Sequence, residues 1–198
     1  MSIEKYFPEF QDEIIRFVEI CHRLYNKEFV CAYDGNVSLK RGDRILITPT
    51  HLCKGDLLKD DLLIVRENGE QLYGARHPSS ELKLHLAVYA AQPETQCIIH
   101  AHPLYATALY RGGKSVDVSV LTEASDTLGD VPVVPFEAPG SKALADAVGA
   151  AMTVGIHACV MEKHGVVVAG CDLEATYYML ESLERLARTE TVLATMKL

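Results

Sequence analysis

The apolar run Cys97–Ile99, followed at once by His100-Ala101-His102, most constrains what this chain can form. We expect a strand over residues 96–102. Residues i and i+2 of a strand project to the same face, so the two imidazoles can converge on one point while Ala101 faces away. The sequence therefore predicts a strand that delivers two histidines to the same side of a sheet.

A third histidine is expected near the first two. A catalytic zinc-type site needs about three protein ligands and an open position, and histidine is the commonest ligand. His164 lies in the short segment 162–165, between the apolar runs 158–161 and 166–169. Neutral imidazoles favour a zinc-class divalent metal over magnesium or calcium. A polar strand end is the simpler interpretation of His-x-His alone, and the third histidine beside Gly165 weakens it.

Length and composition set the class of protein. With 198 residues and 48% hydrophobic residues, the chain can bury a core, and we expect one domain over residues 1–198. The six cysteines form no C-x-x-C pair, which is typical of reduced thiols in a cytoplasmic protein. The charged N-terminal segment and the lack of a long apolar run predict no signal peptide and no membrane span. A net charge of −8 disfavours nucleic-acid binding but leaves an anionic small substrate open.

Periodicity and turn residues predict the remaining elements. We expect helices over about 9–25, 78–91, 103–110 (closed by Gly112-Gly113), 141–152 and 172–195. The expected strands are 36–40, 44–48, 62–66, 71–73, 96–102, 132–136, 158–161 and 166–169. Most strands follow one another through short turns. This pattern predicts an antiparallel or mixed sheet with helices on both faces.

Glu81 has two interpretations. It follows Ser79-Ser80 at the expected start of a helix, where a carboxylate complements the helix dipole and needs no other role. Beside a metal, the same carboxylate acts as a general base, or as a fourth ligand that the substrate displaces.

Three clusters of small polar residues lie where loops meet regular elements: residues 35–38, 48–50 and 79–80. Hydroxyls, an asparagine amide and free backbone N–H groups can bind an anion without arginine or lysine. Each cluster alone is more typical of an ordinary turn or cap. Together they suggest a phosphate site.

In their order along the chain, these segments resemble the class II aldolase/adducin family, over roughly residues 9 to 195. The segments that carry the resemblance are Gly35–Ser38, Ile47–Thr50, Pro78–Glu81 with His85 and Tyr89, Ile99–Pro103, Pro132–Gly140 and Lys163–Gly165. The family implies an α/β fold, a three-layer α/β/α sandwich on a mostly antiparallel sheet. It also implies a homotetramer with active sites between subunits.

The resemblance assigns roles to residues of this chain. It makes His100, His102 and His164 the ligands of one divalent metal, Zn²⁺ by preference, and Glu81 the catalytic carboxylate. The phosphate-binding positions it implies are Gly35, Asn36, Thr50, Ser79 and Ser80. The implied reaction cleaves a ketose phosphate to dihydroxyacetone phosphate and an aldehyde through a metal-stabilised enediolate.

Two departures and several alternatives accompany this hypothesis. His51 stands where the family usually has glycine, so its side chain would narrow the phosphate pocket or contact phosphate itself. Some family aldolases carry a C-terminal tail over the active site and a tyrosine proton donor, and neither can be placed here, since Tyr105 and Tyr110 do not match the family's position. Family epimerases carry Asp at the position of Glu81, which favours an aldolase or a decarboxylase over an epimerase; a dehydratase also stays open. Glu123 is a candidate extra acid/base. A non-enzymatic adducin-like interaction domain is the remote alternative.

Overall fold

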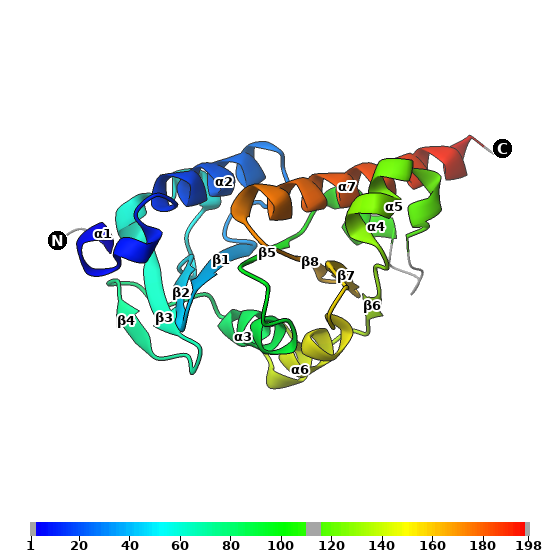
Figure 1. Cartoon of the computed structure of the whole chain (residues 1–198). Coiled ribbons are helices and arrows are strands. Elements are labelled where there is room, and N and C mark those ends of the chain that lie inside the picture. Colours follow the sequence, from blue (N-terminus) through cyan, green and yellow to red (C-terminus); the bar gives the residue numbers. More distant parts are fainter. Residues whose placement is uncertain (1–2, 110–115, 197–198) are drawn as a thin grey trace.

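The apolar runs of the sequence form an eight-stranded sheet in the computed structural model, which describes residues 3–109 and 116–196 (Figure 1). The strands are β1 (Asn36–Arg41), β2 (Arg44–Ile47), β3 (Leu63–Arg66), β4 (Gln71–Tyr73), β5 (Cys97–Ala101), β6 (Val133–Val134), β7 (Ala158–Met161) and β8 (Gly165–Gly170). Their order across the sheet is β4-β3-β2-β1-β5-β8-β7-β6. Within the described residues, β6 and β7 are parallel and the other six neighbouring pairs are antiparallel, so the sheet is mixed.

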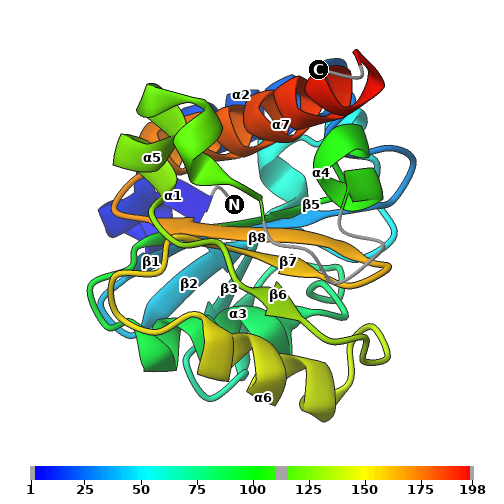
Figure 2. The same cartoon turned by 90° about the vertical axis from the view of Figure 1, so that its right-hand side faces the viewer.

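Helices lie against both faces of this sheet. They are α1 (Ile3–Tyr6), α2 (Ile14–Asn26), α3 (Leu82–Ala91), α4 (Leu104–Leu109), α5 (Thr122–Leu128), α6 (Lys142–Ala151) and α7 (Leu173–Thr195). Single 3-10 turns are η1 (Pro8–Phe10), η2 (Lys54–Asp56), η3 (Lys59–Asp61) and η5 (Val118–Val120). Figure 2 shows α2, α4, α5 and α7 on one side of the sheet and α3 with α6 on the other.

Two apolar cores follow from the alternation of side chains along the strands. In β8, Val166 and Val168 pack into the core under α2 and α7, whereas Val167 and Ala169 pack into the core above α3 and α6. A sheet covered on both faces explains why these strands are continuous apolar runs rather than alternating ones. Ile98 belongs to the core above α3 and α6. His100 follows two residues later on β5, so its side chain lies on the same face of the sheet.

Most predicted elements are confirmed to within a few residues, and the differences are local. The first long helix begins at Ile14 instead of just after Pro8, since residues 8–10 form a separate 3-10 turn. The helix expected from Pro78 begins at Leu82, and Glu81 is its N-cap residue. The helix expected over 103–110 is α4, and Tyr110 and Gly112-Gly113 lie outside the described residues. The helix α5 was not expected.

Side-chain caps begin the helices expected over 141–152 and 172–195, and the capping residues are Ser141 and Asp172. The backbone N–H of Leu144 donates to Ser141 Oγ at 3.0 Å, and that of Ala175 donates to Asp172 Oδ1 at 2.7 Å. Such caps satisfy backbone donors that the first helical turn leaves free. No helix in the described part of the chain has the length and apolar character of a membrane span.

Candidate metal and substrate site

His100 is held rigidly at the centre of the sheet. Its strand, β5, lies between β1 and β8, where His100 is paired with Asn36 on one side and Val167 on the other. The side chain is buried, and its Nδ1 lies 2.9 Å from the carbonyl oxygen of Val166. Only a protonated Nδ1 can make that hydrogen bond, so in the neutral ring Nε2 carries the lone pair.

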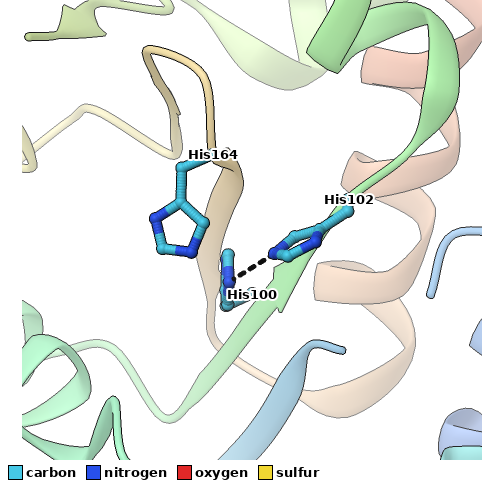
Figure 3. A group of neighbouring side chains, drawn as sticks. All are labelled: His100, His102 and His164. Carbon is cyan, nitrogen blue, oxygen red and sulfur yellow. Dashed lines mark hydrogen bonds between the residues drawn. The ribbon is translucent and has the colours of Figure 1, made fainter. Parts of the chain in front are cut away.

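His102 and His164 approach His100 from two other segments. His102 lies just past the end of β5, and its backbone N–H donates to the carbonyl of Phe29 at 2.8 Å. His164 lies in the β7–β8 turn, and its N–H donates to the carbonyl of Met161 at 3.1 Å. The three rings point toward one another (Figure 3), with one nitrogen from each within 4.8 Å of the others.

Two glycines make room for this cluster. A Cβ on Gly165 would collide with the carbonyl oxygen of Ala101 and lie 2.5 Å from Cδ2 of His102. Gly35 has a φ of +67°, and a Cβ there would lie 2.8 Å from the carbonyl oxygen of His100. Glycine is the residue that accepts such close approaches and the left-handed backbone. The glycine after His164 is therefore a packing requirement of the histidine cluster.

Glu81 completes the cluster from the start of α3. Its Oε2 lies 2.9 Å from Nε2 of His100, and its Oε1 lies 3.4 Å from Nε2 of His164. Asn36 Nδ2 donates to Oε2 at 3.4 Å. The carboxylate is buried, and within the described residues Oε1 has no hydrogen-bond partner. Glu81 is the N-cap residue of α3, but its side chain makes no capping hydrogen bond to that helix. Its carboxylate contacts the histidine cluster instead.

The donor set fits a divalent cation. Nε2 of His100 lies 3.0 Å from Nε2 of His102 and 2.9 Å from Oε2 of Glu81. With Nδ1 of His100 bonded to Val166, a neutral His100 ring turns its Nε2 lone pair toward the Glu81 carboxylate, and a positive charge at this point relieves the repulsion between the two acceptors. Nδ1 of His164 is also buried without a hydrogen-bond partner in the described part of the chain. Three imidazoles beside a carboxylate are ligands of the zinc class.

The pKa shifts of the histidines and Glu81 also favour a positive charge within the cluster. Burial and the positive charge of a protonated His100 lower the pKa of His102 and of His164 to about 4. Burial also acts to lower the pKa of His100, but the Glu81 carboxylate outweighs it and raises that pKa. At Glu81 burial acts to raise the pKa, yet the charges of His100 and His164 hold it well below its usual range. Neutral His102 and His164 beside an ionised Glu81 are ready to bind a cation near pH 7.

Every site residue predicted from the sequence borders one pocket of about 170 Å³. The lining residues are Tyr33, Asp34, Gly35, Asn36, Pro49, Thr50, Ser79, Ser80, Glu81, His100, His102, Pro139 and His164. Its polar wall away from the histidines contains the neutral groups of Gly35, Asn36, Thr50, Ser79 and Ser80, and Asp34 adds a carboxylate near His102. The Ser79 hydroxyl accepts a hydrogen bond from the backbone N–H of Glu81 at 3.2 Å, which ties this wall to the carboxylate. The phosphate role of these groups stays a prediction.

The loops opposite the histidines hold residues that the sequence did not single out. Asp34 lines the pocket, with Oδ2 3.5 Å from Nδ1 of His102. Lys54 is buried, and its Nζ donates to the carbonyls of Tyr33 at 3.3 Å and Leu52 at 3.1 Å. It thus joins the loop that carries Asp34 to the loop after Thr50. The adjacency of Asp34 to Gly35-Asn36 was the only sequence signal.

His51 does neither of the two things expected of it. Its backbone has a φ of +54°, and its exposed ring makes an edge contact with Tyr33, the ring centroids being 6.2 Å apart. Tyr33 lines the pocket, whereas His51 does not. The side chain that replaces the family's usual glycine therefore supports the pocket rim from outside.

Other candidate residues lie elsewhere. Glu123 is exposed on α5. Tyr105 lines a different cavity, together with Glu184 and Arg188. His22 is half-buried, and its Nε2 donates to the carbonyl of Leu57 at 2.9 Å. The histidine pocket is not bordered by Glu123, Tyr105 or His22, nor by His157.

The chain is similar to known proteins over nearly its whole length. The family model described as Class II Aldolase and Adducin N-terminal domain matches residues 15–191. An L-fuculose phosphate aldolase of Methanococcus maripaludis is 32% identical over 185 residues, or 93% of this chain and 99% of that protein. A 3-oxo-tetronate 4-phosphate decarboxylase of Escherichia coli is 32% identical over 85% of this chain and 81% of its own length. The crystal structure of L-fuculose-1-phosphate aldolase from Thermus thermophilus superposes with a TM-score of 0.82 at 26% identity, over 91% of this chain and 93% of that one.

Proposed function

The chain belongs to the class II aldolase and adducin family and is a lyase of the class II aldolase type, and from this premise we propose that it cleaves a fuculose-1-phosphate-like ketose phosphate. The products would be dihydroxyacetone phosphate and an aldehyde. One observation carries the proposal: an ionised carboxylate, Glu81, lies 2.9 Å from a cluster of three convergent imidazoles in a pocket that is also lined by neutral polar groups.

The roles of the residues follow from their chemistry. We assign His100, His102 and His164 to a divalent metal, Zn²⁺ by preference, which when bound would supply Lewis-acid stabilisation of charge developing on the substrate. Glu81 would accept the hydroxyl proton as the carbon–carbon bond breaks, and would return a proton to the carbon of the dihydroxyacetone phosphate half. Its fixed position, between Asn36 and the histidines, keeps it ionised and aimed into the pocket.

The phosphate would lie against Gly35, Asn36, Thr50, Ser79 and Ser80. These residues line the pocket and offer backbone and side-chain donors without a formal positive charge. Binding by neutral donors makes affinity depend on the geometry of the loops more than on salt.

Decarboxylation of a sugar-acid phosphate is the second candidate. It is favoured by one observation, the 32% identity to a 3-oxo-tetronate 4-phosphate decarboxylase, which equals the identity to the archaeal aldolase. Both reactions break a carbon–carbon bond next to a carbonyl, so the same residues serve either one. The substrate decides between them.

Three further features belong to the proposal. We infer one domain with a three-layer α/β/α arrangement, supported by helices on both faces of the sheet. We infer a homotetramer on family grounds. A cytoplasmic location is supported by the six cysteines, which are all free thiols.

The test uses purified protein reconstituted with Zn²⁺. We expect release of dihydroxyacetone phosphate from L-fuculose 1-phosphate, and exchange of a C3 proton of dihydroxyacetone phosphate with deuterated water when no aldehyde is present. Glu81→Gln should keep its metal and lower kcat by about 10²–10⁴-fold, the usual contribution of a general acid–base group. Near wild-type turnover in Glu81→Gln would make the glutamate structural. Carbon dioxide release from 3-oxo-tetronate 4-phosphate, with no exchange, would establish the decarboxylase instead.

A further inference from the structure

A row of buried polar side chains leads from the pocket into the interface between β1 and α3. Glu81, His85 and Tyr89 are spaced four residues apart on one face of α3, and Asn36 and Ser38 lie two residues apart on one face of β1. The side chains of the two sets interdigitate, and all five are buried. An apolar pair of residues would pack here equally well, so a continuous polar row calls for an account of each hydrogen bond.

The row is connected at every step. Asn36 Nδ2 lies 3.4 Å from Glu81 Oε2, and Asn36 Oδ1 lies 2.5 Å from His85 Nε2. On the other side of the imidazole, His85 Nδ1 lies 2.7 Å from Ser38 Oγ. Ser38 Oγ in turn lies 2.8 Å from the hydroxyl of Tyr89. Both ring nitrogens of His85 are therefore in use, one toward the pocket and one away from it.

The chemistry of Glu81 fixes the direction of every bond. An ionised carboxylate only accepts hydrogen bonds, so the amide group of Asn36 that faces it must be the NH₂ group. Oδ1 of Asn36 then faces His85 as an acceptor, and Nε2 of His85 must carry the proton. Nδ1 is left as an acceptor for the Ser38 hydroxyl, so Ser38 accepts from Tyr89 at 2.8 Å, and the single Tyr89 proton favours this contact over the more distant carbonyl of Gln96 at 3.4 Å. Donation thus runs from Tyr89 through Ser38, His85 and Asn36 to Glu81.

We propose that His85 is a positioning residue for catalysis, which holds the Asn36 amide with its NH₂ group toward Glu81 and so fixes the catalytic carboxylate. The proposal rests on the proposed role of Glu81. Without the Nε2–H donor, the Asn36 amide can rotate and place its carbonyl oxygen against the carboxylate, where two acceptors repel. Bonds that all point the same way also polarise one another, which strengthens the last donation to Glu81.

The charge state of the imidazole is consistent with this directional row. Burial and the positive charge of a protonated His100 lower the pKa of His85 to about 3, although the Glu81 carboxylate acts in the opposite direction. A neutral ring has a single N–H, so a choice of tautomer is a choice of direction for the whole row.

The first test is the tautomer itself, read from ¹⁵N chemical shifts of the histidine rings in the folded, Zn²⁺-loaded protein. We expect His85 as the neutral Nε2–H tautomer, assigned by its loss in His85→Gln. An Nδ1–H tautomer would reverse the row and overturn the proposal. This measurement requires no substrate, so it stands apart from the identity of the reaction.

The second test separates positioning from folding. His85→Leu should lower kcat about ten- to hundredfold, because it would release the Asn36 amide and so weaken the Asn36 hydrogen bond to the ionised Glu81, while its metal content stays at that of the wild type. His85→Gln should recover most of kcat, because its amide N–H₂ can replace Nε2–H as a donor. Ser38→Ala and Tyr89→Phe should lower kcat progressively less, in that order, with distance from Glu81.

Thr176→Val is the matched control. Thr176 is fully buried and donates from Oγ1 to the carbonyl of Asp172 at 2.6 Å, at the start of α7 and away from the row. It should lower the melting temperature and leave kcat unchanged. If His85→Leu keeps kcat, or His85→Gln is no better than His85→Leu, the positioning role is wrong. If instead Glu81→Gln keeps turnover, the proposed function fails, and it does so independently of the His85 tautomer.

Discussion

The two halves of the pocket are built by different means. The histidine half rests on the paired strands β5 and β8, where His100 lies in the middle of a hydrogen-bonded ladder and His164 directly precedes β8. The opposite half rests on loops, which include the left-handed residues Ala32 and His51, with φ of +45° and +54°. Ladders tolerate little displacement, whereas such loops are held only by particular side chains.

The comparison separates chemistry from substrate choice. The histidine half is fixed by backbone that many sequences can form, and in our proposal it binds the metal. The loop half depends on Lys54, Tyr33 and His51, which hold two loops against each other. We therefore expect changes in the histidine half to abolish metal binding, and changes in the loop half to alter KM with the metal retained.

The largest effect is expected from His102→Ala. Removal of one of three imidazole ligands should leave the purified protein without stoichiometric metal and without lyase activity. Elemental analysis of the protein measures the loss. His157→Ala is the control, since His157 lines a different cavity. Equal metal content in His102→Ala and the wild type would remove His102 from the site.

Gly165→Ala should come next, because its new methyl group has no room beside His102. Changes in the groups that orient a metal ligand typically lower metal affinity by about 10–100-fold. Competition with a chelator measures that affinity. Gly149→Ala on α6, where a Cβ would lie 3.2 Å from Ala87 Cβ, is the matched control and should bind metal normally. Normal affinity in Gly165→Ala would show that the histidine half is more adaptable than its ladder suggests.

Lys54→Met tests the loop half. The carbonyls of Tyr33 and Leu52 would lose a charged donor, which costs about 1–3 kcal/mol in the free energy of unfolding. The loops would separate, so KM for a phosphorylated ketose should rise severalfold while metal content stays constant. Lys59→Met, which removes an exposed lysine 3.4 Å from Glu4, controls for the loss of charge. An unchanged KM in Lys54→Met would mean that the loops keep their positions without the lysine.

The smallest effect is expected from His51→Gly. Glycine relieves the left-handed backbone, which costs other residues about 1–2 kcal/mol, but it also gains entropy in the unfolded chain. A net rise of at most about 1 kcal/mol in the free energy of unfolding should result. Glu28→Gly, at a φ of +58° outside the pocket, should give the same gain without a change in KM. If His51→Gly also leaves KM unchanged, the Tyr33–His51 contact plays no part in substrate binding.

The same division explains how much the sequence could predict. The convergence of His100 and His102 follows from strand periodicity, which is local, and the glycine turn identified the third histidine. The polar clusters were also recognisable, because caps and turns have characteristic residues. The position of β5 between β1 and β8 could not be predicted from the sequence, since pairing between distant strands depends on the whole sheet.

The misses have physical causes. Asp34 and Lys54 act through contacts between loops, and no spacing rule describes such contacts. The helix expected from Pro78 begins only at Leu82, so Glu81 is its N-cap residue and not part of its first turn. The helix α5 has a weak apolar pattern of only two buried residues, Ala124 and Leu128, so periodicity gave no signal.

The β5–β8 ladder also links metal loading to the free energy of unfolding of the whole protein. His100 and His164 meet only when these strands are paired, so an ion held by all three histidines would bind the folded chain and not the unfolded one. Such a ligand stabilises the folded state by about 2.7 kcal/mol when its free concentration is a hundred times its Kd. The thermal midpoint of a preparation would therefore report its metal supply. Chelators used during purification would lower the yield of folded protein before any assay of activity could detect the loss.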